Sequence, residues 1–251
     1  MNLDVNKRIF DIWKKFSGDK NKGYKENFDK LINKKDNKNL KDPLNQLCPI
    51  TYKESEYTKP EYSRIKYRFL FAGFNPSFNE NHYKKCIKST KEKIQKPYDF
   101  FKYDEYQSKY EDIVNVDYSL RNEESDFKDN YYKTYFDRLK KFIDDDILKN
   151  KDRDILHHVH IDPFFIRGTN QNQAKEILEI GNKNENMSDF AMEQLKLFEE
   201  MIKSYEPTHI IILNATASHI LSKRWGNNKD KNDIKTSFEF DNIRVICGGM
   251  L

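Results

Sequence analysis

Cysteine is scarce in this sequence, since Cys48, Cys86 and Cys247 are the only three among 251 residues. An odd number of distant cysteines without a C-x-x-C pair excludes a disulfide framework and a four-cysteine metal or iron-sulfur site within one chain. No apolar run approaches the roughly 18 residues that a membrane-spanning helix needs, and the N-terminus lacks a signal-peptide apolar stretch. These absences favour a cytoplasmic protein that has no membrane contact.

Arginine is also scarce. The chain has 9 Arg against 36 Lys and 25 Asn, with a formal net charge of +4. An AT-rich coding sequence produces this excess of Lys and Asn whatever the function, so the basic charge is weak support for a nucleic-acid partner. Arginine clusters interleaved with aromatic residues would be a better sign, because the guanidinium group fits phosphate geometry and stacks on rings.

Aromatic residues, in contrast, are abundant, with 18 Phe, 15 Tyr and 2 Trp. They exclude a wholly disordered chain, because they allow a hydrophobic core to form. The length predicts one domain and a smaller N-terminal piece. Residues 1–60 are predicted to form a helical extension, since Ile9, Trp13 and Phe16 recur at helical spacing. Residues 61–251 are predicted to form the main domain.

Strand and helix patterns alternate along this main domain. Short apolar runs predict strands over 66–72, 155–161 and 208–214, and a closing strand pair over 237–240 and 243–247. Amphipathic patterns predict helices over 132–143, 190–201 and 217–225, the second of them capped by Ser188 or Asp189. The fold class is therefore α/β, with a central, mainly parallel, four-stranded sheet between helices. In such sheets, functional groups gather at the carboxyl ends of the strands.

The first strand ends in the segment Gly73-Phe74-Asn75-Pro76-Ser77. Glycine allows a sharp turn and proline restricts the backbone after the asparagine, so the Asn75 amide is expected at the mouth of the sheet. An alternative is an Asx turn in which this side chain only caps its own loop.

The segment YRFLFAGFNPS resembles the first motif of the uracil-DNA glycosylase superfamily, and especially its mismatch-specific and thymine-DNA glycosylase branch. Further segments follow in a matching order: ILHHVHIDPFFIR, PTHIIILNATASHIL and IRVICGGML. The resemblance covers roughly residues 62–251. It implies a three-layer α/β/α fold and a DNA glycosylase that hydrolyses the bond between a base and its sugar.

The resemblance also implies roles for the residues of the first motif. Asn75 would orient a water molecule beneath the sugar C1′ of a flipped nucleotide, through positioning and electrostatics. Phe74 and Phe78 would stack on the extruded base, although Phe78 is equally typical of a core aromatic. DNA would be the partner, and neither a metal nor an organic cofactor is implied. The other substrate-binding positions of this motif are Gly73, Pro76 and Ser77.

The second strand ends in His160-Ile161-Asp162-Pro163. Strand alternation places His158 and His160 on one face and His157 on the other, so these histidines do not by themselves predict a metal site. Asp162 lies near the position where relatives carry an asparagine that reads uracil. A carboxylate only accepts hydrogen bonds, so it would suit a base edge with N–H donors, and Asp162→Asn would shift the preference towards uracil. The alternative role is a local cap.

Three further segments are candidates for DNA contact. Arg167 and Thr169 either contact phosphate or belong to a polar loop that continues through Gln171. Asn214 is a candidate substrate contact, and Ser218 a candidate phosphate contact, where a helix start follows the third strand. Small residues there have the alternative role of letting helix and sheet pack closely.

The chain departs from the family pattern in two places. The last strand reaches Gly248-Gly249-Met250-Leu251 without the histidine or insertion loop of the second catalytic motif, which leads us to expect a domain that is incomplete at its C-terminal end. Residues 79–128 form a long insertion with no assigned role. Two alternative functions therefore stay open: an inactive relative that binds nucleic acid or protein, and an unrelated nucleotide-binding α/β enzyme.

Overall fold

The computed structural model describes residues 4–17, 50–74, 114, 118, 138–139, 141–149, 153–166, 171–180, 187–226 and 236–248. The chain divides into two compact units. The first unit comprises Met1–Tyr52, Asn75–Tyr118 and Phe164–Leu197, and the second comprises Lys53–Phe74, Ser119–Pro163 and Phe198–Leu251. The predicted boundary at residue 60 stays a prediction.

Helix α1 (Val5–Ser17) belongs to the first unit. The predicted apolar stripe is buried, and the rings of Trp13 and Phe16 lie 5.5 and 5.4 Å from the ring of Phe190. The buried Asn6 side chain donates to the Tyr52 carbonyl at 2.7 Å and accepts from the Tyr52 amide at 2.8 Å. This pair of bonds satisfies a buried polar side chain and ties α1 to the segment at residue 52.

Helix α8 (Asp189–Tyr205) begins in the first unit and ends in the second. The predicted Ser188 cap is confirmed, because its hydroxyl oxygen accepts from the Ala191 amide at 3.2 Å. The buried Gln194 accepts from the Phe165 amide at 2.7 Å. Helix α7 (Gln171–Ile177), for which no helix was predicted, also belongs to the first unit, and its first residue, Gln171, was predicted as the end of a polar loop.

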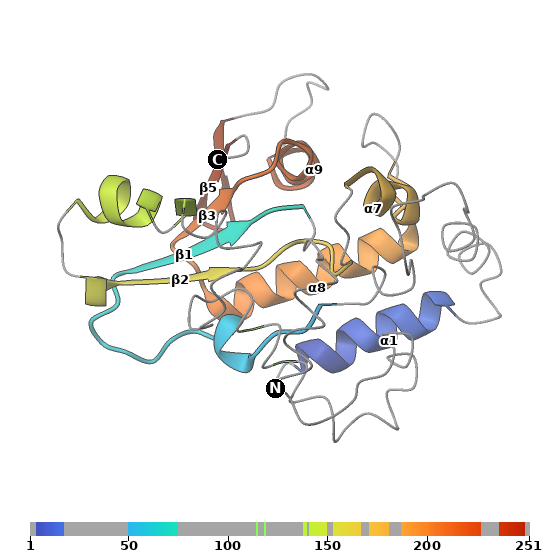
Figure 1. Ribbon diagram of the computed structural model, residues 1–251, viewed down its shortest axis with the longest axis horizontal. Coiled ribbons are helices and arrows are strands. Elements are labelled where there is room, and N and C mark those ends of the chain that lie inside the picture. The colour runs from blue at the N-terminus through green and yellow to red at the C-terminus, as the bar shows by residue number, and fades with distance from the viewer. Residues whose placement is uncertain are drawn as a thin grey trace. The chain divides into compact units, whose positions relative to one another are not determined.

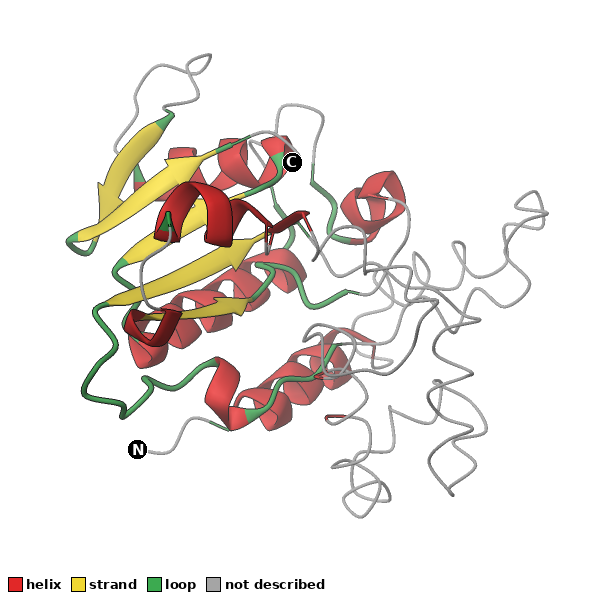
Figure 2. Cartoon of the chain, turned by 60° about the vertical axis from the view of Figure 1, so that its left-hand side comes forward, coloured by secondary structure: helices red, strands yellow, loops and turns green. Residues whose placement is uncertain are grey.

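The second unit is built on one sheet, and its α/β class is confirmed (Figures 1 and 2). The predicted number of four strands is wrong: the sheet has five, in the order β2-β1-β3-β5-β4. Strands β1, β2, β3 and β5 are parallel neighbours, and β4 pairs antiparallel with β5 at the edge. The bounds are Tyr67–Ala72 for β1, Leu156–His160 for β2, His209–Ile212 for β3, Ser237–Phe240 for β4 and Ile243–Cys247 for β5.

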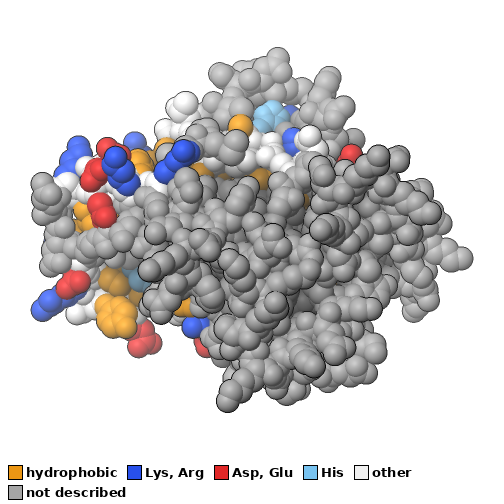
Figure 3. Space-filling model, viewed as in Figure 1, with side chains coloured by type: hydrophobic (Ala, Val, Ile, Leu, Met, Phe, Trp, Pro, Cys, Tyr) orange, Lys and Arg blue, Asp and Glu red, His pale blue; other side chains and the backbone are white. Residues whose placement is uncertain are grey.

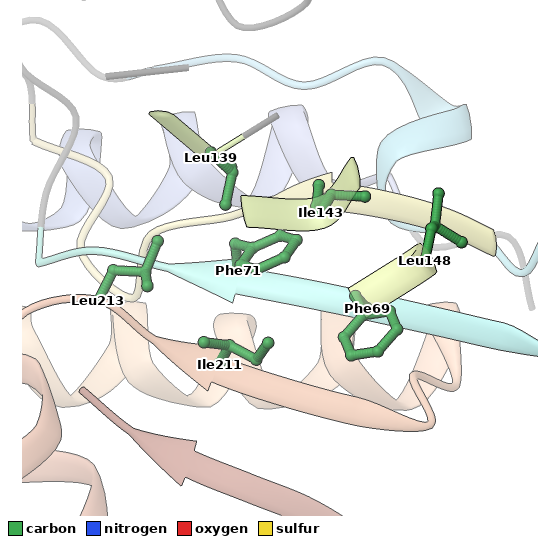
Figure 4. Close-up of a cluster of buried hydrophobic side chains, with 7 residues drawn as sticks. All are labelled: Phe69, Phe71, Leu139, Ile143, Leu148, Ile211 and Leu213. Atoms are coloured by element: carbon green, nitrogen blue, oxygen red, sulfur yellow. The ribbon is translucent and has the colours of Figure 1, made fainter. Parts of the chain in front are cut away.

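One face of this sheet is covered by the π-helix η5 (Phe142–Leu148). Alternate side chains of β1 and β3 point towards it, as Figure 4 shows for Phe69, Phe71 and Ile211. Leu213, directly after β3, continues this row. Leu139, Ile143 and Leu148 complete the cluster from the helical side. Two short 3-10 turns, η3 (Glu54–Glu56) and η6 (Arg153–Ile155), lead into β1 and β2. The paired strands therefore have a dry face that fixes their register.

The opposite face is covered by the end of α8 and by helix α9 (Ala215–Trp225). The Tyr205 hydroxyl lies 2.8 Å from His157 Nδ1, on the face opposite to His158, whose ring contacts Phe71. Strand alternation is thus confirmed for these two histidines. Glu199 on α8 accepts from the Arg224 side chain at 2.9 Å and from the Trp225 ring nitrogen at 2.7 Å, which braces the two helices.

The described surface carries charges of both signs. Figure 3 shows basic and acidic side chains next to one another on the described part of the face in view. No helix in the described ranges has the length and apolar character that crossing a membrane requires.

His157 predicts how stability depends on pH. Burial lowers the pKa of His157 below 6.5, so the folded protein binds fewer protons there than the unfolded chain. Stability from this group is complete above pH 6.5 and is lost as the pH falls below that value. We expect the free energy of unfolding, measured in urea, to fall less between pH 7.5 and 5 in His157→Asn, which keeps an acceptor for Tyr205, than in the wild type. Parallel pH profiles would contradict this assignment.

Candidate functional site

The candidate site lies where four parallel strands end at one edge of the sheet. Pairing continues one residue beyond the strands: the Ile161 amide donates to the Phe71 carbonyl at 2.9 Å, and the Leu213 amide to the Ala72 carbonyl at 2.7 Å. The Gly248 amide donates to the Ile212 carbonyl at 2.8 Å. These backbone bonds hold the first residue after each strand in place. Side chains at these positions are therefore attached to well-supported backbone.

A side chain at this edge, that of Asp162, binds the backbone of Gly73. The Gly73 amide donates to Asp162 Oδ1 at 2.7 Å, and the Asp162 residue is only 4% exposed. A hydrogen bond to a buried carboxylate contributes about 1.5 to 3 kcal/mol, more than a neutral one. This bond links the exits of β1 and β2. The alternative role of Asp162 as a local cap stays a prediction.

Gly73 is required here for space and not for an unusual backbone angle. Its φ lies outside the left-handed region that favours glycine. A Cβ at this position would lie 2.6 Å from Asp162 Oδ1, which is closer than real Cβ contacts come. The carboxylate can approach the backbone only because the residue has no side chain.

His160 adds an ionisable side chain to this pair. Its Nε2 lies 3.7 Å from Asp162 Oδ1, and the two side chains are 13% and 5% exposed. This distance is too long for a hydrogen bond but short enough for a charge interaction when the imidazole is protonated. No role was predicted for His160, although its position two residues before a strand-end aspartate was a usable signal.

Asn214 caps helix α9. Its side-chain oxygen accepts from the Thr216 amide at 2.9 Å and from the Ala217 amide at 3.1 Å. Two helix-end amides are thereby satisfied, which is the ordinary role of an N-cap asparagine. Its predicted contact with substrate stays a prediction, and it would compete with this cap for the same oxygen.

Ser218 also contacts the fold itself. The side chain is buried, and its hydroxyl donates to the Gly248 carbonyl at 3.3 Å. Burial raises the pKa of the neighbouring Cys247 thiol, and a hydrogen bond with Ser218 acts in the opposite direction. These contacts join α9 to the end of β5. They agree with the alternative prediction that small residues here let helix and sheet pack closely. The predicted phosphate contact stays a prediction.

The other predicted site residues divide into two groups. Phe74, a candidate for base stacking, is buried at 3% exposure. The rest lie outside the described residues, so their predicted roles are neither confirmed nor contradicted; they are Asn75, Pro76, Ser77, Phe78, Arg167 and Thr169. Of the predicted set, the structure therefore brings together Gly73 and Asp162.

Within the described ranges, His, Cys, Asp and Glu side chains form no group of three or more that could hold a metal ion. The site instead combines a buried carboxylate, an imidazole and a backbone amide. Such groups can orient a polar loop and transfer a proton. No protein-family model matches the chain, and no curated protein matches it either.

The close approach at Gly73 predicts the effect of adding a methyl group. Gly73→Ala should lower the free energy of unfolding by about 1 to 3 kcal/mol, because the new Cβ displaces the Asp162 carboxylate and weakens its bond to the amide. The matched control is Gly248→Ala at another strand exit, where a Cβ would meet the Ile212 carbonyl oxygen at an ordinary 3.5 Å. We expect the control to stay within about 0.5 kcal/mol of the wild type in urea unfolding. Equal losses in the two variants would contradict the steric explanation.

Proposed function

We propose that the second unit has a three-layer fold like that of the uracil-DNA glycosylase superfamily, and that the protein hydrolyses the N-glycosidic bond of a flipped uracil-type or modified base in DNA. The observation that carries the proposal is the bond between the Gly73 amide and Asp162. It fixes the first residue of the Gly-x-Asn-Pro motif at the carboxyl edge of a parallel sheet, which is where α/β proteins bind ligands.

In this proposal Asn75 orients the attacking water. A carboxamide is not a general base at neutral pH, but its oxygen can hold water in line with C1′ while positive charge develops on the sugar. Asn75 is two positions after Gly73 in the sequence. Asp162 then acts as a positioning residue for the catalytic loop.

Asp162 also bears on the choice of base. One carboxylate oxygen accepts from the Gly73 amide, and the carboxylate has a second oxygen that can only accept. A base edge with an amino group would satisfy that oxygen, whereas a uracil carbonyl would not. A modified cytosine is therefore a suitable substrate to test beside uracil.

A second candidate is a relative that keeps the fold and binds nucleic acid without hydrolysis. Three residues that were predicted to contact substrate or DNA instead stabilise the fold, which favours this candidate. Phe74 is buried, Asn214 caps α9, and Ser218 bonds to Gly248. Binding of DNA without base release would support this second candidate over the first.

The proposal predicts abasic sites in DNA. We expect the wild type to produce them in oligonucleotides that contain at least one of uracil, mismatched thymine or modified cytosine. Asn75→Ala should lower the single-turnover rate by about 100-fold, because the water loses its orienting oxygen. The matched control is Asn172→Ala, an exposed asparagine on α7, which should keep the wild-type rate. Absence of abasic product from every substrate would reject the hydrolase.

A further inference from the structure

Two exposed tyrosines lie on the segment that leads into strand β1. Among the described residues, Tyr62 and Tyr67 are the large hydrophobic side chains that are exposed, at 76% and 39%. Arg64 and Lys66 lie between them in the sequence, and both are exposed. Aromatic and basic side chains are thus interleaved within one short exposed segment, in a chain that has few arginines. This combination is typical of surfaces that bind nucleic acid.

Backbone hydrogen bonds support this segment. The Ile65 amide donates to the Tyr62 carbonyl at 3.2 Å, which closes a turn with Ser63 and Arg64 in its middle. The Lys66 amide donates to the Ile155 carbonyl at 2.8 Å, which joins the segment to the start of β2. The exposed side chains are therefore attached to backbone that is held in place.

Tyr67 continues this surface onto the sheet. Its ring lies 6.4 Å from the ring of His209, the first residue of β3, and strand pairing places the exposed Arg244 of β5 beside His209. Burial, together with the charge of Arg244, lowers the pKa of His209 below 6.5, so its ring is mostly neutral at pH 7. We call this surface the amino-edge patch; it comprises Tyr62, Arg64, Lys66, Tyr67, His209 and Arg244.

The charge of the amino-edge patch is balanced. Its three cations have three exposed acidic neighbours in adjoining segments and in the paired strand β4, namely Glu61, Asp154 and Glu239. Duplex DNA is held mainly by phosphate contacts, so a patch with little net charge is poorly suited to it. Unpaired bases, in contrast, can stack on exposed aromatic rings.

We infer that the amino-edge patch binds single-stranded nucleic acid, with bases stacked on Tyr62 and Tyr67 and phosphates bound by Arg64 and Lys66. Every base has a π-face, so this binding is independent of sequence. Strands β1, β3 and β5 are parallel, so their first residues lie at the edge opposite to the candidate site. The patch is therefore separate from that site, and its binding does not depend on the proposed function.

The test is equilibrium binding of the full chain to a labelled oligothymidylate of about twelve nucleotides. We expect a dissociation constant of about 10⁻⁴ to 10⁻⁶ M at physiological salt. Tyr62→Leu should weaken binding by about tenfold, because it removes a stacking ring from an exposed position. The matched control is Tyr62→Phe, which keeps the ring and should stay within about twofold of the wild type.

Salt dependence gives a second measurement. Arg64→Gln should reduce the slope of log affinity against log salt by about 0.7, the value for one lost phosphate contact on a single strand. The control is Lys196→Gln, an exposed lysine in the part of α8 that belongs to the first unit, and it should leave the slope unchanged.

Three results would overturn the inference and leave the proposed hydrolase untouched. They are absence of binding at about 10⁻⁴ M protein, equal affinities of Tyr62→Leu and Tyr62→Phe, and an equal effect of Tyr62→Leu on a duplex of the same length. If Tyr62→Leu does not fold, the salt slope decides: a lower slope in Arg64→Gln alone supports the patch, and an unchanged slope rejects it.

Discussion

The hydrogen bond from the Gly73 amide to the Asp162 carboxylate is the contact on which the candidate site depends. It joins residues that are 89 positions apart in the sequence, and it places a buried negative charge at the exit of two neighbouring strands. Two features follow from it. Residue 73 must be glycine, because the carboxylate occupies the space of a Cβ. His160 Nε2 lies 3.7 Å from the same carboxylate oxygen.

This contact is effective because the sheet beneath it is rigid. Strand β1 lies between β2 and β3, and its residues from Phe69 to Ala72 are buried on both faces. The side chains of η5 pack against one face of the sheet. The second half of α8, together with α9, covers the other face. A backbone position at the end of such a strand is held by pairing and packing, which is the support that a functional site needs.

The strands could be predicted from the sequence because their signals are local. Each apolar run is bounded by turn residues, and the Ser188 cap precedes an amphipathic helix. Helix α7 was not predicted because it is short and most of its residues are polar. The closing strand pair was predicted from its own apolar runs, but β4 was not counted in the central sheet that it joins. The contact between Gly73 and Asp162 was not predicted, because neither segment alone shows which distant residue it will bind. Local rules did foresee the alternative packing role of Ser218.

In the proposed mechanism Asp162 acts through the segment that carries Asn75, and a double-mutant cycle of these two residues is the sharpest test. The measurement is the rate of base release in wild type, Asp162→Ala, Asn75→Ala and the double variant. Residues that work as a unit give non-additive losses, so we expect Asn75→Ala to cost little further activity once Asp162 is removed. Losses that multiply would show that Asp162 and Asn75 act independently, and would contradict the account.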